Sequence, residues 1–405
     1  MRELQDSGIE WIGIAPSSWK VTYLSSVLSE RKHKNVGMQE DNLLSLSYGN
    51  VKQKDINTND GLLPESFEGY NIIEDGDIVL RLTDLQNDHR SLRTGLCRQR
   101  GIITSAYCTL KRNNGEDDPR YLRYYLHCFD LCKGFYGMGA GVRQGLNFDG
   151  IRKIEMLLPT PVEQTAISDY LDAQIEKVDA LIANQQAQIE KLKQYKQSLI
   201  TEVVTKGLNP DSPMKDSGND LLGQIPAHWK AIKIKYLCSM QAGRNLISEQ
   251  ISDSGDYPVY GGNGLRGYFT EPNYIGECLL VGRQGALCGN VHHVSGEFWA
   301  TEHAVITEPK EGVSIRYLFY LLTGMNLNLY VSPTAAQPGL SVSTVQNVIS
   351  CLAPVDEQEQ IVKLLDDKIR MIESLLQIKE KKIESLTNYK KSVIYEYVTG
   401  KKEVV

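Results

Sequence analysis

The sequence of 405 residues lacks several features that would each assign it to a class of protein. It has no run of about 18 apolar residues, so no segment is predicted to span a membrane. Its first residues, MRELQDSGIEW, lack the apolar region of a secretory signal. Its formal net charge of −6 gives no overall basic signal of the kind that nucleic-acid-binding proteins carry. We therefore expect a cytoplasmic protein, in which any nucleic-acid contact comes from a local patch.

The motifs of common catalytic and cofactor sites are also absent. No G-x-x-x-x-G-K-[ST] phosphate loop occurs, and the glycine-rich residues 137–141 lack the flanking strand and helix of a dinucleotide site. No acidic pair with a nearby lysine indicates a nuclease centre. We therefore predict no catalytic residue and no cofactor, and a stand-alone methyltransferase or nuclease is not favoured.

None of the eight cysteines forms a C-x-x-C pair. The nearest two, Cys128 and Cys132, are four residues apart on a predicted helix, and His127 precedes them. No second ligand pair accompanies this group, so zinc binding there is the alternative to reduced, partly buried thiols, which we favour. We predict no metal ligand, and interpret His292-His293 and His303 as surface or core residues.

What the sequence does contain is an internal repeat. The residues Asp6-Ser7-Gly8, Gly13, Pro16 and Trp19-Lys20 recur with the same spacing as Asp216-Ser217-Gly218, Gly223, Pro226 and Trp229-Lys230. Further along, Glu163-Gln164 recurs as Glu357-Gln358, and identities continue to Thr205 and Thr399. The stretches between the repeated parts do not resemble each other. A duplicated frame with different inserts predicts two binding surfaces in a fixed mutual geometry.

The downstream repeats are predicted to be long helices that form an antiparallel coiled coil. Their apolar residues follow steps of three and four: Leu171, Ile175, Val178, Ile182, Ile189, Leu192, Leu199 and Val203 in the first, and Leu365, Ile369, Ile372, Leu376, Ile383, Leu386, Val393 and Tyr397 in the second. Polar residues interrupt both seams at equivalent places, Gln185 and Lys379, then Lys196 and Lys390, and are expected to fix the register. The alternative is that each helix packs on its own globular domain. The second helix is expected to end without the glycine that follows the first, Gly207.

The remaining parts indicate an α+β fold. Short runs such as 76–81 and 278–283 are typical of strands, and residues 119–132 and 313–323 predict one helix in each half. The proline-containing linker 208–215 is a domain boundary. We predict two globular domains, residues 1–160 and 208–355, joined by the long helices 161–207 and 356–405, with the halves related by a pseudo-twofold axis.

The inserts contain the candidate binding residues. Residues 81–112 hold seven basic side chains, opposed locally only by Asp84 and Asp88. Arginine side chains can pair with guanine, and glutamine or asparagine side chains can pair with adenine. The other basic side chains suit contacts to phosphates. The alternative is that this basic stretch is an ordinary solvated surface. The second insert is less basic, but its glycines allow close approach to a partner. The residues predicted to contact DNA are Arg81, Thr83, Gln86, Arg90 and Arg93 in the first insert, and Tyr260, Asn263, Arg266, Arg283 and Gln284 in the second.

Taken together, the chain resembles the specificity subunit of type I restriction–modification systems over essentially its whole length. The resemblance lies in the segments Pro159–Gln164 and Pro354–Gln358, the helices that follow them, and the Gly-x-x-Pro-x-x-Trp segments at Gly13–Trp19 and Gly223–Trp229. It implies that each insert is a target recognition domain for one half of a bipartite double-stranded DNA site, with the spacing set by the helices. It also implies docking of two methyltransferase subunits, joined by motor-nuclease restriction subunits, and no catalytic centre in this chain. The alternative function is a coiled-coil scaffold that binds two protein partners without a DNA role.

Overall fold

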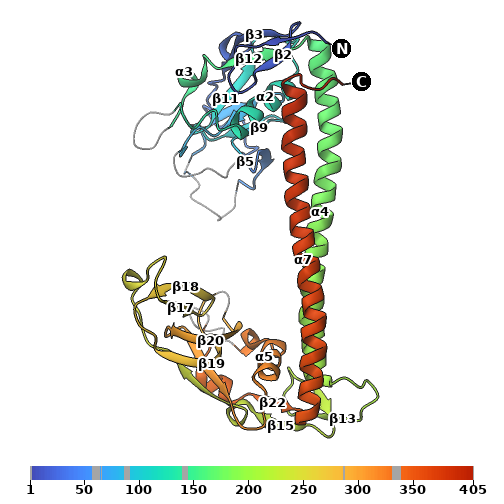
Figure 1. The fold of residues 1–405 in the computed structure, drawn as a ribbon. Helices are drawn as coiled ribbons and strands as arrows, with labels where there is room; N and C mark the ends of the chain where they lie inside the picture. The colour runs from blue at the N-terminus through green and yellow to red at the C-terminus, as the bar shows by residue number, and fades with distance from the viewer. Residues whose placement is uncertain are drawn as a thin grey trace. The chain divides into compact units, whose positions relative to one another are not determined.

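The computed structural model describes residues 2–56, 64, 66–85, 92–138, 145–285, 288–330 and 339–404 (Figure 1). The chain divides into two compact units, one formed by Met1–Gln185 with Lys381–Val405 and the other by Gln186–Glu380. Both units mix helices and strands, as the sequence predicts. Within the part of the chain that the structure describes, no helix combines the length and apolar character needed to cross a bilayer.

The first unit is built on a four-stranded antiparallel sheet. Its strands lie in the order β4 (Leu28–Glu30), β11 (Cys108–Arg112), β8 (Ile78–Leu80) and β9 (Thr94–Leu96). Four two-stranded pairs surround this sheet: β1 (Leu4–Asp6) with β2 (Ile14–Pro16), β3 (Lys20–Tyr23) with β12 (Glu155–Leu158), β5 (Leu44–Ser47) with β6 (Asn50–Gln53), and β7 (Asn71–Ile73) with β10 (Gly101–Ile103). The helices of the globular part are α1 (Leu24–Val27), α2 (Pro119–Leu131) and α3 (Phe148–Ile151).

The second unit is built on a six-stranded sheet. Its strands lie in the order β16 (Cys238–Ala242), β21 (Ala304–Pro309), β19 (Tyr274–Gly282), β20 (Val291–Ala300), β17 (Tyr257–Gly261) and β18 (Gly264–Phe269). Two strand pairs repeat those of the first unit: β13 (Met214–Asp216) with β14 (Gln224–Pro226), and β15 (Lys230–Lys233) with β22 (Ile349–Leu352). The helices are α5 (Ile315–Gly324) and α6 (Val342–Asn347), with short 3-10 turns at Ile234–Tyr236, Ser248–Gln250 and Leu327–Tyr330.

The shared frame is larger than the sequence repeat. The order β4-β11-β8-β9 of the first unit corresponds to β16-β21-β19-β20 of the second, although the sequences of these strands do not match. The units differ at the margins of the sheet, where the first has the β5–β6 hairpin and the second has the β17–β18 hairpin. The stretches that differ in sequence therefore share a four-stranded sheet and differ in the hairpins beside it.

The repeated Glu-Gln pair has a structural explanation. Gln358 is almost fully buried at the start of α7 (Val355–Val398). Its side-chain oxygen accepts a hydrogen bond from the backbone N–H of Ser314, the N-cap of α5, at 2.9 Å, and its amide donates to the carbonyls of Gly312 and Ala353 at 3.0 and 2.9 Å. Gln164 makes two equivalent contacts, accepting from the backbone N–H of Asp118 and donating to the carbonyl of Pro159, whereas its third hydrogen bond goes to the side-chain carboxylate of Asp117 at 2.8 Å. The glutamine thus joins the long helix to the shorter helix of the same unit.

The long helices α4 (Pro161–Lys206) and α7 pack antiparallel within each unit, as predicted. In each unit residue numbers rise along one helix as they fall along the other. The contacts that define this register are Tyr170 with Tyr397 and Asp179 with Lys390 in the first unit, and Gln188 with Lys379 and Lys196 with Glu373 in the second. The lysines interrupting the seam thus bind polar side chains of the facing helix, which supports their predicted role in register.

Each core is completed by the end of the long helix that belongs to the other repeat. Val393, Ile394 and Val398 of α7 are buried in the core of the first unit. Ile200, Val203 and Val204 of α4 are buried equivalently in the second. Neither repeat therefore contains a complete core by itself.

The expectation that the second helix lacks a terminal glycine is wrong. Gly400 follows α7 with a φ of 71°, close to the 74° of Gly207 after α4. Each glycine packs on a Pro–Trp pair of the repeated frame: Gly400 on Pro16 and Trp19, Gly207 on Pro226 and Trp229. The correspondence was missed because Gly400 directly follows Thr399, whereas Lys206 separates Thr205 from Gly207, which shifts the spacing by one residue.

We expect Gly400→Ala to destabilise the first unit more than Gly207→Ala destabilises the second. Both substitutions place a side chain on a left-handed backbone, which costs about 1–2 kcal/mol. A Cβ at Gly400 would lie 2.4 Å from Pro16 Cδ, whereas one at Gly207 would lie 3.2 Å from the Trp229 ring. Urea denaturation of the full chain measures both losses, and equal losses would contradict a role for the Pro16 contact.

Candidate nucleic-acid interface

The turn of the β17–β18 hairpin brings together three of the predicted DNA-contacting residues of the second unit. Asn263, Arg266 and Gln284 are exposed and line one hollow of about 500 Å³. His303 lines the same hollow, with its Nε2 3.1 Å from a carboxylate oxygen of Glu302. The arrangement presents an amide, a guanidinium, a second amide and an imidazole around one opening. His303 was not predicted to bind, because its position beside the hairpin depends on pairing between distant strands.

Glycines allow the two segments of this site to approach each other. A Cβ on Gly282, at the end of β19, would lie 2.2 Å from the carbonyl oxygen of Gly262, so only glycine fits there. Gly264 begins β18 with a φ of 99°, a backbone conformation that residues with a side chain rarely adopt. The sequence pattern of glycines between polar residues therefore positions Asn263 and Gln284 on one surface.

The other two predicted residues of the second unit lie beside this hollow rather than in it. The ring of Tyr260 is half-buried and packs edge-to-face on Phe298, with centroids 5.5 Å apart. Arg283 is half-buried, and its backbone bonds to His303 and Leu340. Among the described residues, its buried Nε has no hydrogen-bond partner.

Arg93 has a structural position that conflicts with its predicted contact to a base. Its side chain is 0% exposed. The guanidinium donates hydrogen bonds to the carbonyls of Arg81 and Thr83 at 3.1 and 2.8 Å and of Asp84 at 3.2 Å, and lies over the ring of Tyr136. Arg93 therefore cannot reach a base in this conformation, and instead holds the loop that follows β8. Charge counting missed this because burial depends on the tertiary fold.

The remaining predicted residues of the first insert differ in their surroundings. Thr83 is exposed and Arg81 is half-buried on the loop that Arg93 holds. Buried Leu82 and Leu85 anchor this loop to the core. Gln86 and Arg90 lie outside the described residues.

We expect Arg93→Lys to lower the free energy of unfolding by about 1–3 kcal/mol, because an ammonium cannot satisfy three carbonyls in the geometry of a guanidinium fork. Arg81→Lys is the matched control on the same loop and should change stability by no more than about 0.5 kcal/mol. Urea denaturation measures both. Equal effects would show that the fork geometry of Arg93 is not required.

The cysteines and histidines form no metal site in the described part of the chain. All eight cysteines are free thiols, as expected, and seven are buried. Among the described residues, no group of three potential ligands occurs, and His127, Cys128 and Cys132 are not brought together with a further ligand. His293 instead pairs with Glu277 at 2.7 Å.

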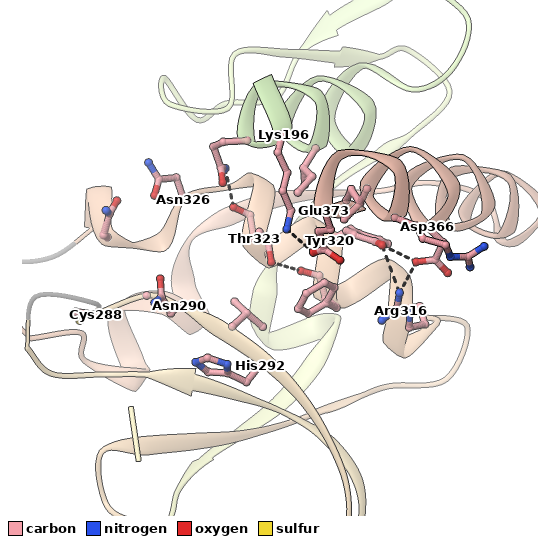
Figure 2. Close-up of a pocket in the computed structure, with 18 residues that line it drawn as sticks. Lys196, Cys288, Asn290, His292, Arg316, Tyr320, Thr323, Asn326, Asp366 and Glu373 are labelled. Carbon is pink, nitrogen blue, oxygen red and sulfur yellow. Dashed lines mark hydrogen bonds and ion pairs between the residues drawn. The ribbon is translucent and has the colours of Figure 1, made fainter. Parts of the chain in front are cut away.

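Each unit also contains a hollow between its globular part and the long helices, and the two hollows correspond. In the second unit Arg316 and Tyr320 of α5 contact Asp366 of α7, and Lys196 of α4 contacts Glu373, in a hollow of about 560 Å³ (Figure 2). In the first unit, where the hollow is about 420 Å³, the same arrangement is made by Arg120, Tyr124, Asp172, Lys390 and Asp179. These residues form a repeated frame around each hollow, which we call the helix pocket of that unit.

Comparisons with known proteins agree with this architecture. Residues 226–387 match a family model described as the type I restriction modification DNA specificity domain. The chain is 32% identical over 259 residues to the type I restriction enzyme EcoprrI specificity subunit of Escherichia coli, an alignment covering 62% of this chain and 60% of the relative. It is 27% identical over 126 residues to a putative type I restriction enzyme specificity subunit of Haemophilus influenzae, covering 30% of this chain and 32% of that relative.

The matched part is thus less than two thirds of either relative's length. A solved structure described for complex assembly and conformational transition of a type I restriction–modification system has the same fold. It superposes with a TM-score of 0.71 over 96% of this chain and 99% of that one, at 14% identity. Residues 226–387 thus form a type I restriction modification DNA specificity domain, and the chain is similar in sequence to type I specificity subunits.

Proposed function

We propose that this chain is the sequence-specific DNA-binding subunit of a type I restriction–modification complex. Residues 1–160 and 208–355 act as target recognition domains, each for one half of a bipartite target. The helical parts, residues 161–207 and 356–405, set the distance between the half-sites. The chain supplies recognition and no catalysis.

The observation that carries this proposal is the polar hollow of the second unit, which lies within the residues that match the family model. The guanidinium of Arg266 can pair with guanine, and the amides of Asn263 and Gln284 can pair with adenine, in the major groove. The glycine-rich turns allow these groups to approach base edges closely. An exposed loop with Thr83 occupies the corresponding place at the sheet of the first unit.

The partners that this function requires are double-stranded DNA, two methyltransferase subunits and the motor-nuclease restriction subunits, in the cytoplasm. The competing function is a coiled-coil scaffold that binds two proteins without DNA. The acidic net charge of −6 favours that alternative, whereas the polar hollow favours DNA.

A binding experiment distinguishes the two functions. It measures the affinity of the full chain for duplex DNA, with methyltransferase subunits added. Phosphate contacts release counterions, so the affinity should fall linearly with salt on a double-logarithmic scale. A target duplex should bind more tightly than a scrambled duplex at every salt concentration. A scaffold would show no preference for the target duplex and no such slope.

We expect Arg266→Ala to weaken target binding by about 1–3 kcal/mol and to relax the preference at one base pair. Gln284→Ala should relax the preference at a different base pair. Leu265→Ala, which changes an exposed apolar residue of the same hollow, is the matched control and should leave base preference unchanged. Selection from a randomised target library measures all three, and an unaltered preference in both polar variants would contradict the assignment.

A further inference from the structure

The helix pocket of the first unit contains two arginines that its carboxylates do not neutralise. Arg98, Arg120, Arg123 and Lys390 line this pocket. Arg120 contacts three aspartates, Asp118, Asp169 and Asp172, at 2.7, 2.7 and 3.1 Å, and Lys390 contacts Asp179 at 2.7 Å. Among the described residues, no carboxylate lies within ion-pair distance of Arg98 or Arg123.

Arg123 is the more constrained of the two. Its guanidinium lies over the ring of Tyr124, 4.8 Å from the centroid, and its Nε is buried with no acceptor among the described residues. Asp172 attracts it but is already engaged by Arg120 and by the hydroxyl of Tyr124 at 2.6 Å. Burial lowers the pKa of Arg123. A buried donor without an acceptor is costly, so an incoming anion would gain a strong partner here.

His127 lies against the same pocket and is also incompletely satisfied. It is 6% exposed, and its Nδ1 has no hydrogen-bond partner among the described residues. Burial, reinforced by the charges of Arg123 and Lys390, lowers its pKa to about 3, so the ring is neutral near pH 7. In a neutral imidazole one ring nitrogen donates and the other accepts, so the free Nδ1 can take either role, according to the tautomer, without adding charge. At the same pocket, the turn of the β5–β6 hairpin presents Tyr48, which is 85% exposed.

The second unit provides an internal comparison, because its helix pocket has the same frame and different neighbours. Phe319 stands where the first unit has Arg123, and Thr323 stands where it has His127. Arg370 replaces Glu176 but is exposed and contacts Asp367 at 3.8 Å. A half-buried, unneutralised arginine is therefore a feature of the first helix pocket and not of the repeated frame.

We propose that the helix pocket of the first unit binds a backbone phosphate of duplex DNA, with Arg98 and Arg123 as its ligands. The proposal rests on the DNA-binding function proposed above and adds a contact outside the predicted base readers. A partner protein docked in two copies would need the same residues in both units, but Arg98, Arg123 and the β5–β6 hairpin belong to the first unit alone. Because these residues occur in one unit only, DNA is favoured over a partner protein bound in two copies: the two half-sites of the DNA meet different surfaces. Glu176, exposed in the same pocket, opposes the anion.

The test uses Arg98→Ala and Arg123→Phe in the full chain, with methyltransferase subunits added. Phenylalanine is chosen because the second unit holds Phe319 in the equivalent place. Each variant should reduce the slope of log affinity against log salt by about one, with unchanged base preference. Glu176→Gln should have the opposite effect and increase the affinity for DNA, because it removes a negative charge from the pocket. Equal thermal midpoints for variants and wild type would show that the fold is retained.

Target duplexes with single methylphosphonate linkages identify the phosphate. At least one neutral linkage should lower the affinity of the wild type for the duplex. The same linkage should leave the affinity of the double variant Arg98→Ala/Arg123→Phe unchanged. If every linkage that weakens the wild type weakens the double variant equally, the phosphate site is wrong. If the variants instead lose methyltransferase subunits, the pocket binds protein and the proposal is also wrong. Absence of salt-dependent binding by the wild type would refute the proposed function itself.

Discussion

Insertion of four residues into both long helices, after Gln185 and after Glu380, is expected to lengthen the target spacer by about two base pairs. Four helical residues add about 6 Å, at about 1.5 Å per residue, and duplex DNA rises about 3.4 Å per base pair. The two insertion points face each other in the antiparallel register, because Gln188 contacts Lys379. They also fall at the boundary between the units, so contacts within each unit are preserved.

Methylome sequencing of cells that carry the variant measures this outcome directly. The half-sites should be unchanged, because the hairpins and loops that present the base readers are not altered. Insertion of seven residues in both helices is the matched control, since a whole heptad preserves the seam and should lengthen the spacer further. Altered half-sites, or an unchanged spacer in both variants, would contradict a role of the helices in spacing.

The second large effect is expected from the buried glutamine of the helix junction. Gln358→Leu should lower the free energy of unfolding of the second unit by about 2–5 kcal/mol. Leucine leaves the N–H of Ser314 and the carbonyls of Gly312 and Ala353 without their partner. The Ala353 carbonyl is buried and Ser314 is half-buried, and an unsatisfied buried group costs about 1–3 kcal/mol, whereas exposed Gly312 can bond to water. The loss exceeds the usual effect of a point mutation because it breaks a buried polar network.

Hydrogen exchange of the full chain locates this effect. Protection should fall in α5 and the start of α7, and Gln164→Leu should produce the same loss in α2 and the start of α4. Glu359→Gln, at an exposed neighbouring position, is the control and should change stability by no more than about 0.5 kcal/mol. A loss spread equally over both units would show that the glutamine does not act locally.

The long helices and the shorter helices 119–132 and 313–323 could be predicted because helical periodicity is local. The heptad seam and the polar residues in it are visible in the sequence. Pairing of the helices follows from the need to bury that seam, and the antiparallel direction follows from a pseudo-twofold relation of the two repeats. The role of Gln164 and Gln358 was not predicted, although their recurrence was the strongest part of the repeat. A conserved spacing identifies a position, but the three hydrogen bonds of each glutamine come from residues that the fold brings to it.

The sheet and most of the candidate site could not be predicted for the same reason. Strand β4 pairs with β11, so residues 28–30 lie beside residues 110–112, and no local pattern specifies such a pairing. Arg93 and Arg98 are equivalent in a count of basic residues, yet one is buried under a loop and the other is exposed at the helix pocket. The burial of the side chain therefore determines which of these two arginines is accessible to a ligand.

The completion of each core by the opposite helix has a consequence for biosynthesis. The second unit is one continuous stretch, Gln186–Glu380, whereas the first unit needs Lys381–Val405. On the ribosome, a nascent chain can therefore close the second unit while the first still lacks Val393, Ile394 and Val398 from its core. The half that is translated first should mature last, and it is the half that a chaperone would have to protect in the meantime.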